Sequence, residues 1–342
     1  MADPAPVPRA TRPTADPVPS PDWLRQQLLD RRRRLAAAPR LARLEDLPQL
    51  IREVDAALGR LDAETYGSCD RCHDPIESER LIADPLQRLC LDCLSEDELR
   101  DLERDLELAA FVQTRLLPPE SIGADGWQIR HRYLPLGPVS GDHCDVLLPR
   151  RPGLPLHFML GDVSGKGVAA SLLMANLQAI FRTLTMLELP LDELVARANR
   201  LFGESTLPSS FATLVVGRLS AGGGLELCNA GHCPPLLIRR EGIAELAATG
   251  LPLGAFPGAA YRATRHELGP GDQLFLYTDG LPEARNDHDD SYGTDRLAAL
   301  AGQIRGVEPD ALLGRYLDDL EAFRRGRARE DDLTLMAIRR TA

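Results

Sequence analysis

The sequence predicts an α+β fold with antiparallel sheets for most of the chain, and a helical, cysteine-rich segment before it. Short β-like runs recur after Trp127, and the helical patterns among them come in clusters instead of alternating with the strands. Clustered helices indicate layers packed on antiparallel sheets, whereas strict alternation would indicate a parallel wound sheet. Two Cys-x-x-Cys pairs between Cys69 and Cys93 predict a separate small metal-binding module.

Length and charge limit the classes of function. The chain has 342 residues, 44% of them apolar, which is enough for two domains or for one large domain with an appendage. Its formal net charge of −11 argues against a protein that coats nucleic acid. Arginine-rich runs at 31–34 and 324–329 are interpreted as solvated helix faces.

The N-terminal residues and the apolar runs predict a cytoplasmic location. Residues 1–20 are rich in proline and lack the apolar core of a signal peptide, so we expect a disordered tail there. No apolar stretch is expected to reach the roughly 18 residues of a membrane span. Thiols stay reduced in the cytoplasm, so the seven cysteines are interpreted as metal ligands plus free thiols.

Residues 21–95 are predicted to form a helical hairpin followed by the cysteine-rich module. Ser20 can cap a helix whose first residue is Pro21 and which Pro39 ends. Apolar residues at helical spacing predict a second helix over 48–63. The short loop between the two helices predicts an antiparallel pair.

The segment 96–119 is predicted to be a linker helix, opened by a capping box of Ser95 and Glu98 and ended by two prolines. Its seam positions alternate three and four residues apart, as in a coiled coil, with one polar member. They are Leu99, Leu102, Leu106, Ala109, Gln113 and Leu116. Two interpretations stay open: a homodimer forms through the helix at 96–117, or the helix packs on its own domain.

The remaining residues, 120–342, are predicted to form one domain. Its β-like runs read QIRHRYL, CDVLL, LHFML, FATLVVGRL, LELCNA, PPLLIRR, QLFLYT and LTLMAIRR. Helical patterns occupy 168–187, 191–204, 294–305 and 309–326.

Four cysteines have the spacing of a zinc site. Two residues separate Cys69 from Cys72 and also Cys90 from Cys93, so each pair can point at one ion. Four thiolates complete a tetrahedral shell and leave no position for water, so we expect one structural Zn²⁺. The alternatives are four unrelated free thiols, or His73 as a competing ligand.

The text around these cysteines, TYGSCDRCHDPIESERLIADPLQRLCLDCL, resembles the zinc finger of the DksA/TraR family over residues 45–95. The shared residues are Tyr66, Gly67, Ile76, Arg80, Leu81, Ala83 and Pro85. Members of that family bind RNA polymerase through acidic residues at a hairpin tip. Here the candidate tip, AAAPRLARLED, is mostly apolar and basic. An RNA-polymerase-associated regulator, in which the following domain only binds, is therefore kept as the alternative function.

Aspartates that follow a β-like run or lie in a glycine turn are the candidate catalytic residues. They are Asp142, Asp145, Asp162, Asp279, Asp331 and Asp332. Strand ends hold side chains rigidly, and a flanking glycine lets the backbone approach a ligand. A carboxylate cluster without cysteine or histidine suits Mg²⁺ or Mn²⁺, and two such ions can activate water for attack on a phosphoryl group. Each aspartate alone is also explained as a turn former or helix cap.

An ordered set of motifs resembles the SpoIIE/RsbU-type branch of the metal-dependent (PPM) serine/threonine phosphatases. The motifs, spread over about residues 110–340, are LLPPE, SGDHCD, GDVSGKG, FATLVV, NAGHCPPLL, YTDGLPEA and DDLTL. The resemblance implies an α-β-β-α sandwich that holds two Mn²⁺ or Mg²⁺ ions between its sheets.

The same resemblance implies which residues hold these ions. Asp142 and Asp162 would be bridging or direct ligands, and Val163 would offer its backbone carbonyl. Asp279 and Asp331 would complete the shell of the second ion. Asp145 and Asp332 would support the direct ligands or be structural, and Asp145 in particular would cap the structure or hydrogen-bond coordinated water. The chain departs from the family pattern at Ser140 and at His143-Cys144, which replace a glycine and two aromatic-type residues.

Two further features have competing interpretations. His232, in the motif NAGH, is either a proton donor to the leaving serine oxygen or part of a turn at a strand end. The stretch GDVSGKG resembles a phosphate-binding loop, but Val168 stands where such a loop requires lysine followed by serine or threonine. We therefore interpret its glycines as the means of bringing Asp162 close to an ion.

The resemblance implies a hydrolase that removes phosphate from phosphoserine or phosphothreonine of a protein. The implied substrate is a phosphorylated anti-sigma-factor antagonist in a bacterial partner-switching pathway. The zinc module would regulate the enzyme through the helix at 96–117, which would act on the helix at 168–187.

Overall fold

The computed structural model describes residues 21–37, 47–206 and 210–341, and the chain divides into two compact units. The first unit ends at Arg104 and the second runs from Asp105 to Ala342. The boundary therefore falls inside the predicted linker helix. The expected disordered tail and most of the candidate hairpin tip lie outside the described residues.

The first unit contains the expected antiparallel pair of helices, α1 (Pro21–Ala37) and α2 (Leu47–Asp62). Leu28 of α1 is fully buried in one cluster with Val54 and Ala57 of α2. Ion pairs join Arg25 to Asp62 and Arg32 to Asp55. The partner number falls as the first number rises, which is the register of an antiparallel pair.

The cysteine-rich module follows α2 and contains two short helices, α3 (Ser78–Ala83) and η1 (Leu91–Cys93). Tyr66 belongs both to the cluster around the cysteines and to the cluster between α1 and α2. Its hydroxyl donates a hydrogen bond of 2.8 Å to the carbonyl of Pro85. This tyrosine therefore connects the module to the hairpin within the first unit.

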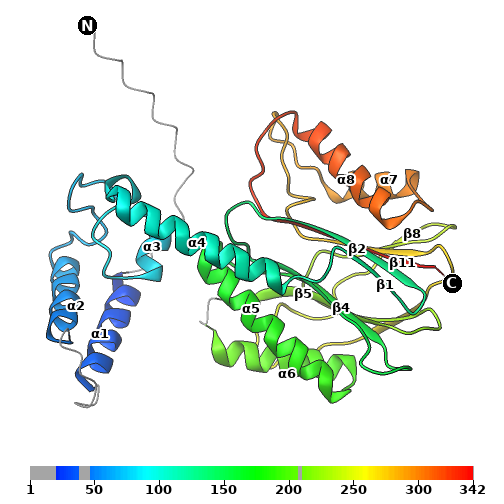
Figure 1. Cartoon of the computed structure of the whole chain (residues 1–342), viewed down its shortest axis with the longest axis horizontal. Helices are drawn as coiled ribbons and strands as arrows, with labels where there is room; N and C mark the ends of the chain where they lie inside the picture. The colour runs from blue at the N-terminus through cyan, green and yellow to red at the C-terminus, as the bar shows by residue number, and fades with distance from the viewer. Residues whose placement is uncertain (1–20, 38–46, 207–209, 342) are drawn as a thin grey trace, which may run out of the picture. The chain divides into compact units, whose positions relative to one another are not determined.

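The second unit is built on two antiparallel sheets (Figure 1). One sheet has the order β1-β2-β11-β10-β7-β8 and the other has the order β3-β4-β5-β6-β9. The strands of the first sheet are β1 (Ser121–Ala124), β2 (Trp127–Leu134), β7 (Leu236–Ile238), β8 (Ile243–Glu245), β10 (Gln273–Tyr277) and β11 (Leu333–Arg340). Those of the second are β3 (Asp142–Leu147), β4 (Leu156–Val163), β5 (Ala212–Leu219), β6 (Gly224–Ala230) and β9 (Thr264–Glu267).

The helices cover the two outer faces of this pair of sheets (Figure 1). The pair on the second sheet is α5 (Gly167–Leu184), extended by η2 (Thr185–Leu187), and α6 (Leu191–Ser205). The pair on the first sheet is α7 (Thr294–Gln303) and α8 (Pro309–Arg324). Separate apolar clusters fill the space between the sheets and the space under each helix pair. The expected α-β-β-α sandwich is therefore confirmed.

The edge strands β1, β8 and β9 were not expected from the sequence. They are 4, 3 and 4 residues long, which is too short for an alternating pattern to be seen.

Helix α4 (Glu96–Leu116) begins with the predicted capping box, in which Ser95 and Glu98 bond each other's backbone N–H groups. Its polar seam residue, Gln113, is buried within the second unit. Leu108, Phe111 and Val112 of α4 are more than half exposed. The end of the predicted seam therefore packs on its own domain, and other apolar residues face solvent.

One expectation about apolar stretches is wrong. Gly167–Leu187 is a helical stretch of 21 residues that is long and apolar enough to cross a membrane. Ser, Asn and Gln residues interrupt the apolar run in the sequence, so it was not recognised as one long apolar stretch. In the fold, Met174, Leu177 and Phe181 of this stretch are buried in the core under the second sheet, as in the core helix of a layered domain.

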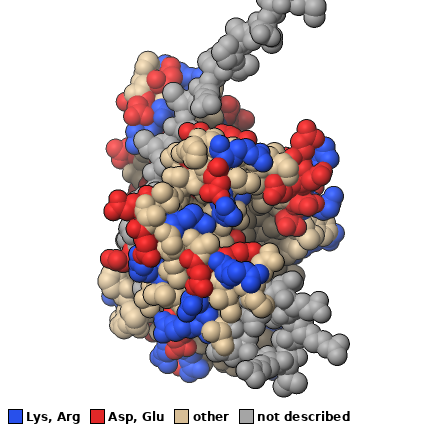
Figure 2. All heavy atoms as spheres, turned by 90° about the vertical axis from the view of Figure 1, so that its left-hand side faces the viewer, with Lys and Arg blue, Asp and Glu red and all other residues tan. Residues whose placement is uncertain are grey.

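Charged side chains of both signs are interspersed on the face shown in Figure 2. Nucleic-acid-binding surfaces carry a continuous basic patch or stripe instead.

Candidate active site

Asp142 and Asp162 lie directly opposite each other on the neighbouring strands β3 and β4. Asp142 is the first residue of β3 and is 1% exposed. Asp162 is partly exposed, next to the end of β4. The register of the sheet thus brings together two carboxylates that stand twenty residues apart in the sequence.

Asp142 is held from the opposite sheet by two threonine hydroxyls. Thr278, just after β10, and Thr334, in β11, donate hydrogen bonds of 2.8 and 2.7 Å to its Oδ2. The two threonines also contact each other, because the backbone N–H of Thr334 donates a hydrogen bond of 2.9 Å to the hydroxyl of Thr278. These bonds fix the carboxylate between the two sheets. Both threonines lie inside motifs quoted from the sequence, YTDGLPEA and DDLTL, but those motifs did not indicate this role for them.

Asp279 and Asp331 reach the site from the other sheet, because β10 and β11 are antiparallel neighbours. Asp279 follows the end of β10, and Asp331 precedes the start of β11. The chain segments approach so closely that a Cβ at Gly280 would collide with the carbonyl of Asp332. This position supports the interpretation that the glycines make room for the aspartates.

Asp332 ties the loop before β3 to the segment before β11. Its Oδ1 accepts the N–H of Leu136 at 2.6 Å, and its Oδ2 accepts the N–H of Gly141 at 3.2 Å. Both carboxylate oxygens of Asp332 accept hydrogen bonds from backbone N–H groups. This geometry favours the structural interpretation of Asp332.

The cluster carries an excess of negative charge, because Lys166 is paired with Asp331 alone. Burial and the neighbouring Asp162 raise the pKa of Asp142 well above its ordinary value. Burial, followed by Asp279, Asp331 and Asp332, raises the pKa of Asp162 to about 7. Burial and Asp331 also raise the pKa of Asp279.

A pair of divalent cations would neutralise this charge, and hard oxygen donors are the ligands that Mn²⁺ and Mg²⁺ prefer. The donor set therefore fits such ions. Among the described residues, no three carboxylates bring one oxygen each within 4.8 Å of one another. The cluster is thus spread over a wider region than a single-ion cage.

Val163 lies next to the loop before β3. Its N–H donates to the carbonyl of Gly141 at 3.2 Å, and a Cβ at Gly141 would lie only 2.8 Å from the carbonyl oxygen of Val163. The same Cβ would lie 3.1 Å from Oδ1 of Asp162. The Val163 carbonyl therefore lies beside the carboxylate of Asp162.

Asp145 is turned away to helix α5, and its side chain is fully buried. Arg182 donates to both of its oxygens, at 2.7 and 3.0 Å, and Gln178 donates to Oδ2 at 3.0 Å. These partners leave it a structural role, in place of the suggested contact with coordinated water.

Helix α4 supports the loop that precedes Asp142. Gln113 donates to the carbonyl of Ser140 at 2.7 Å and accepts its N–H at 3.0 Å. The hydroxyl of Ser140 in turn accepts the N–H of Asp142 at 3.0 Å. In the sequence, Gln113 is the one polar residue of an apolar seam, and this interruption is the signal for the contact.

His232 is buried, and burial lowers its pKa to about 4. Its Nδ1 is 2.7 Å from the hydroxyl of Thr213, and Asn229 bonds both backbone groups of His232. A histidine that stays neutral at pH 7 is a poor proton donor. The geometry therefore favours the structural interpretation of the NAGH turn.

The four cysteines of the first unit form a compact group. Their sulfur atoms all lie within 4.8 Å of one another, and Cys72 and Cys90 are 3.5 Å apart. Arg71 donates its N–H to Cys69 at 3.4 Å, a bond that stabilises a thiolate. His73 lies outside the group, with an exposed side chain and a φ of 60°. The donor set fits a closed tetrahedral zinc site.

Two family models match separate parts of the chain. Residues 152–341 match the family model described as stage II sporulation protein E (SpoIIE). Residues 64–99 match the model described as the prokaryotic DksA/TraR C4-type zinc finger.

Individual relatives agree with these matches. Protein IcfG of Synechocystis is 26% identical over 265 residues, which are 69% of this chain and 41% of the relative. The chain thus spans less than half the length of that protein. The phosphoserine phosphatase RsbU of Bacillus subtilis is 23% identical over 70% of this chain and 71% of its own.

Among solved structures, the SiaA-PP2C domain of Pseudomonas aeruginosa matches 71% of this chain and 98% of that chain. The TM-score is 0.61 at 18% identity, so this likeness shows a shared fold. The SpoIIE model alone covers more than half of the sequence. The chain therefore belongs to the SpoIIE family, and a C4 zinc finger of the DksA/TraR type precedes its domain of PP2C-type phosphatase fold.

Proposed function

We propose that the second unit hydrolyses phosphoserine or phosphothreonine of a protein substrate with the help of two Mn²⁺ or Mg²⁺ ions. Asp142, Asp162, Asp279 and Asp331 would hold the ions together with the carbonyl of Val163. The observation that carries this proposal is the convergence of the carboxylates from two sheets, with raised pKa values that divalent cations would relieve.

When bound, such a pair of ions supplies Lewis acidity that activates a water molecule and neutralises phosphoryl oxygens. The residues of the chain supply position. Thr278 and Thr334 aim Asp142 from the opposite sheet, and Asp332 holds the loop before β3 in place. The strand ends thus fix the carboxylates before substrate arrives, which avoids reorganisation during the reaction.

The proposed substrate is a phosphorylated anti-sigma-factor antagonist in a bacterial partner-switching pathway, with a cytoplasmic location for the reaction. The resemblance to RsbU-type phosphatases supports this assignment, and RsbU itself is named a phosphoserine phosphatase.

The proposed regulator is the zinc finger, with one structural Zn²⁺ held by Cys69, Cys72, Cys90 and Cys93. Helix α4 begins in the first unit and ends in the second, so it can carry a change of state along the chain. At its end, Gln113 supports Ser140, and the carbonyl of Leu116 accepts a hydrogen bond of 2.8 Å from Gln178 of α5. The exposed Leu108, Phe111 and Val112 of α4 offer an apolar surface to a second copy in a homodimer.

The alternative function is an RNA-polymerase-associated regulator whose phosphatase domain only binds. The match of residues 64–99 to the DksA/TraR finger favours it, and the complete carboxylate set speaks for catalysis. The two functions differ in whether phosphate is released.

The test is Mn²⁺-dependent phosphate release from a phosphoserine peptide and from phosphorylated antagonist proteins. Asp279→Asn should lower turnover by at least about 100-fold, because it removes a carboxylate of the cluster. Asp318→Asn, an equal change at an exposed position of α8, is the matched control. Near wild-type rates in Asp279→Asn would contradict the two-ion proposal, and inactive wild-type protein would favour the alternative function.

A further inference from the structure

Lys166 is the only lysine of the chain. The other 39 of the 40 Lys and Arg residues are arginine. Arginine therefore serves at every other position where this protein uses a basic side chain for solvation or ion pairing. The one position that keeps lysine lies in GDVSGKG, between strand β4 and helix α5.

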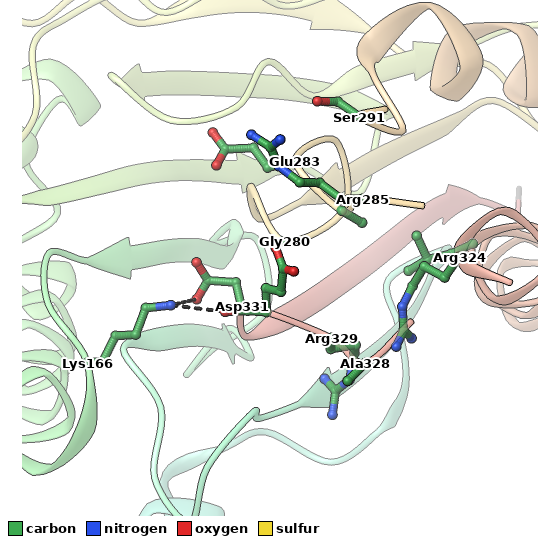
Figure 3. Close-up of a pocket in the computed structure, with 12 residues that line it drawn as sticks. Lys166, Gly280, Glu283, Arg285, Ser291, Arg324, Ala328, Arg329 and Asp331 are labelled. Atoms are coloured by element: carbon green, nitrogen blue, oxygen red, sulfur yellow. Dashed lines mark hydrogen bonds and ion pairs between the residues drawn. The ribbon is translucent and has the colours of Figure 1, made fainter. Parts of the chain in front are cut away.

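The ammonium group of Lys166 reaches the candidate active site. Its Nζ lies 3.3 Å from Oδ1 of Asp331 and donates a hydrogen bond of 3.1 Å to the carbonyl of Glu330. Figure 3 shows the side chain of Lys166 extended toward Asp331. The side chain is 52% exposed, so the ammonium remains accessible.

Lys166 also lines a cavity of about 550 Å³ that opens beside Asp331 (Figure 3). Three arginines line the same cavity, and each has partners of its own. Arg285 pairs with Asp289, Arg324 pairs with Glu321, and Arg329 donates to the carbonyls of Leu134 and Pro135. Among these basic groups, Lys166 is the one that is paired with a carboxylate of the site.

A purely structural bridge gives no reason for lysine at this position. The planar fork of arginine can bond a carboxylate and a neighbouring carbonyl together, and it loses less freedom for each bond formed. An ammonium is instead a compact point charge with three donors, and lysine is a common phosphate ligand in that capacity. It also takes less space than a guanidinium beside ions and a phosphoryl group.

We propose that the Lys166 ammonium binds a phosphoryl oxygen of the substrate at the mouth of the carboxylate cluster. This role rests on the proposed phosphatase function and adds a substrate-contacting residue to it. The contact with Asp331 holds the ammonium at the site until a phosphoryl group takes its place as partner.

The sole lysine allows a direct test on the full-length protein. Reductive methylation with ¹³C-formaldehyde labels Lys166 and the N-terminal amine, which are distinguished by their chemical shifts. In excess Mg²⁺, inorganic phosphate should shift the Lys166 methyl resonance saturably and leave the N-terminal resonance in place. This readout needs no turnover.

Kinetics on a phosphoserine peptide provide the second test. Lys166→Met and Lys166→Arg should each lower kcat/KM by about 10- to 100-fold and weaken inhibition by inorganic phosphate by about 10-fold. Arg151→Met is the charge-matched control, because Arg151 lies on the turn at the opposite end of strands β3 and β4. It should stay within about twofold of wild type.

Full activity in Lys166→Arg, or a methyl resonance that phosphate leaves unmoved, would overturn the proposal. A loss in Lys166→Met that higher Mg²⁺ restores would overturn it as well, since Lys166 would then act on the ions. Wild-type protein that releases no phosphate contradicts the proposed function instead, and the methyl titration still decides whether Lys166 binds phosphate.

Discussion

Gln113 of helix α4 bonds both backbone groups of Ser140, donating to its carbonyl at 2.7 Å and accepting its N–H at 3.0 Å. The side chain of Gln113 is buried, so water does not replace these bonds freely. Ser140 then receives the N–H of Asp142 on its hydroxyl. A single amide side chain thus links the helix to the backbone of the carboxylate cluster.

Gln113→Leu should weaken the ion site without removing a ligand. The substitution leaves a buried N–H and a buried carbonyl without partners, at about 1–3 kcal/mol each. We expect the loop around Ser140 to shift and the half-saturating Mn²⁺ concentration to rise by about 10-fold. Mn²⁺ titration of phosphate release measures this change.

The control for that substitution is Thr114→Ala, because Thr114 is the exposed neighbour and bonds only the carbonyl of Ala110 within the same helix. It should leave the Mn²⁺ titration unchanged. Identical titrations for Gln113→Leu and wild type would show that the helix does not support the site.

Asp162 gives a prediction about pH. Its pKa in the folded protein is about 7, above the ordinary 3.8, so the folded state binds the extra proton between about pH 4 and pH 7. In the absence of divalent ions the folded state therefore loses stability as the pH rises through this window. Asp162→Asn removes that loss, and the ion-free variant should be more stable than wild type at pH 8.

The expected gain is on the order of 1–2 kcal/mol after allowance for partial exposure, or a few degrees in Tm. Thermal unfolding in ion-free buffer at pH 5 and pH 8 measures it, with Asp318→Asn as the exposed control. Added Mn²⁺ should stabilise wild type and not Asp162→Asn. An ion-free Asp162→Asn variant that is less stable than wild type at pH 8 would refute the argument.

Much of the fold followed from periodicity. Apolar residues recur at helical spacing in α6, and β11 contains a nearly continuous apolar run, so both were recognised. Strands of three or four residues, such as β8, repeat too little to be seen. Apolar content alone does not distinguish a core helix from a membrane-spanning one. The packing of α5 against β4 and β5 shows that it is a core helix.

The site was predictable to a similar extent. Aspartates next to glycines at strand ends give a local signal, and the ordered motifs tell which of them belong together. Thr278 and Thr334 lie inside two of these motifs, and Gln178 lies outside them. All three act through partners more than thirty residues away, so the sequence did not show which aspartates they contact. Asp145 looked like Asp142 in sequence, and only the position of Arg182 separates their roles.

Asp145→Asn should destabilise the second unit. It removes a fully buried charge that is bonded twice by Arg182 and once by Gln178. The side chain of Arg182 is about half exposed and can be hydrated, so we expect a loss of about 1–3 kcal/mol rather than that of a deeply buried pair. Urea unfolding measures the difference.

Arg197→Ala serves as the control for this pair, since its partner Glu193 and Arg197 itself are each about half exposed on α6. Surface pairs of this kind contribute about 0–1 kcal/mol. Equal stabilities of Asp145→Asn and wild type would mean that α5 does not depend on the buried contact.

We expect zinc binding to depend on Cys72 and not on the neighbouring His73. Cys72→Ser removes one of four sulfur ligands from the group, and the metal contributes much of the folding free energy of such small modules. We expect loss of bound zinc and faster hydrogen exchange over residues 66–93, while β4 and β11 of the second unit stay protected.

The control is His73→Asn. This variant should keep its zinc, because the imidazole lies outside the sulfur group and asparagine tolerates a φ of 60°. Loss of zinc from His73→Asn would show that the ligand set includes His73, whereas faster exchange in β4 after Cys72→Ser would show that the phosphatase domain depends on the finger for its fold.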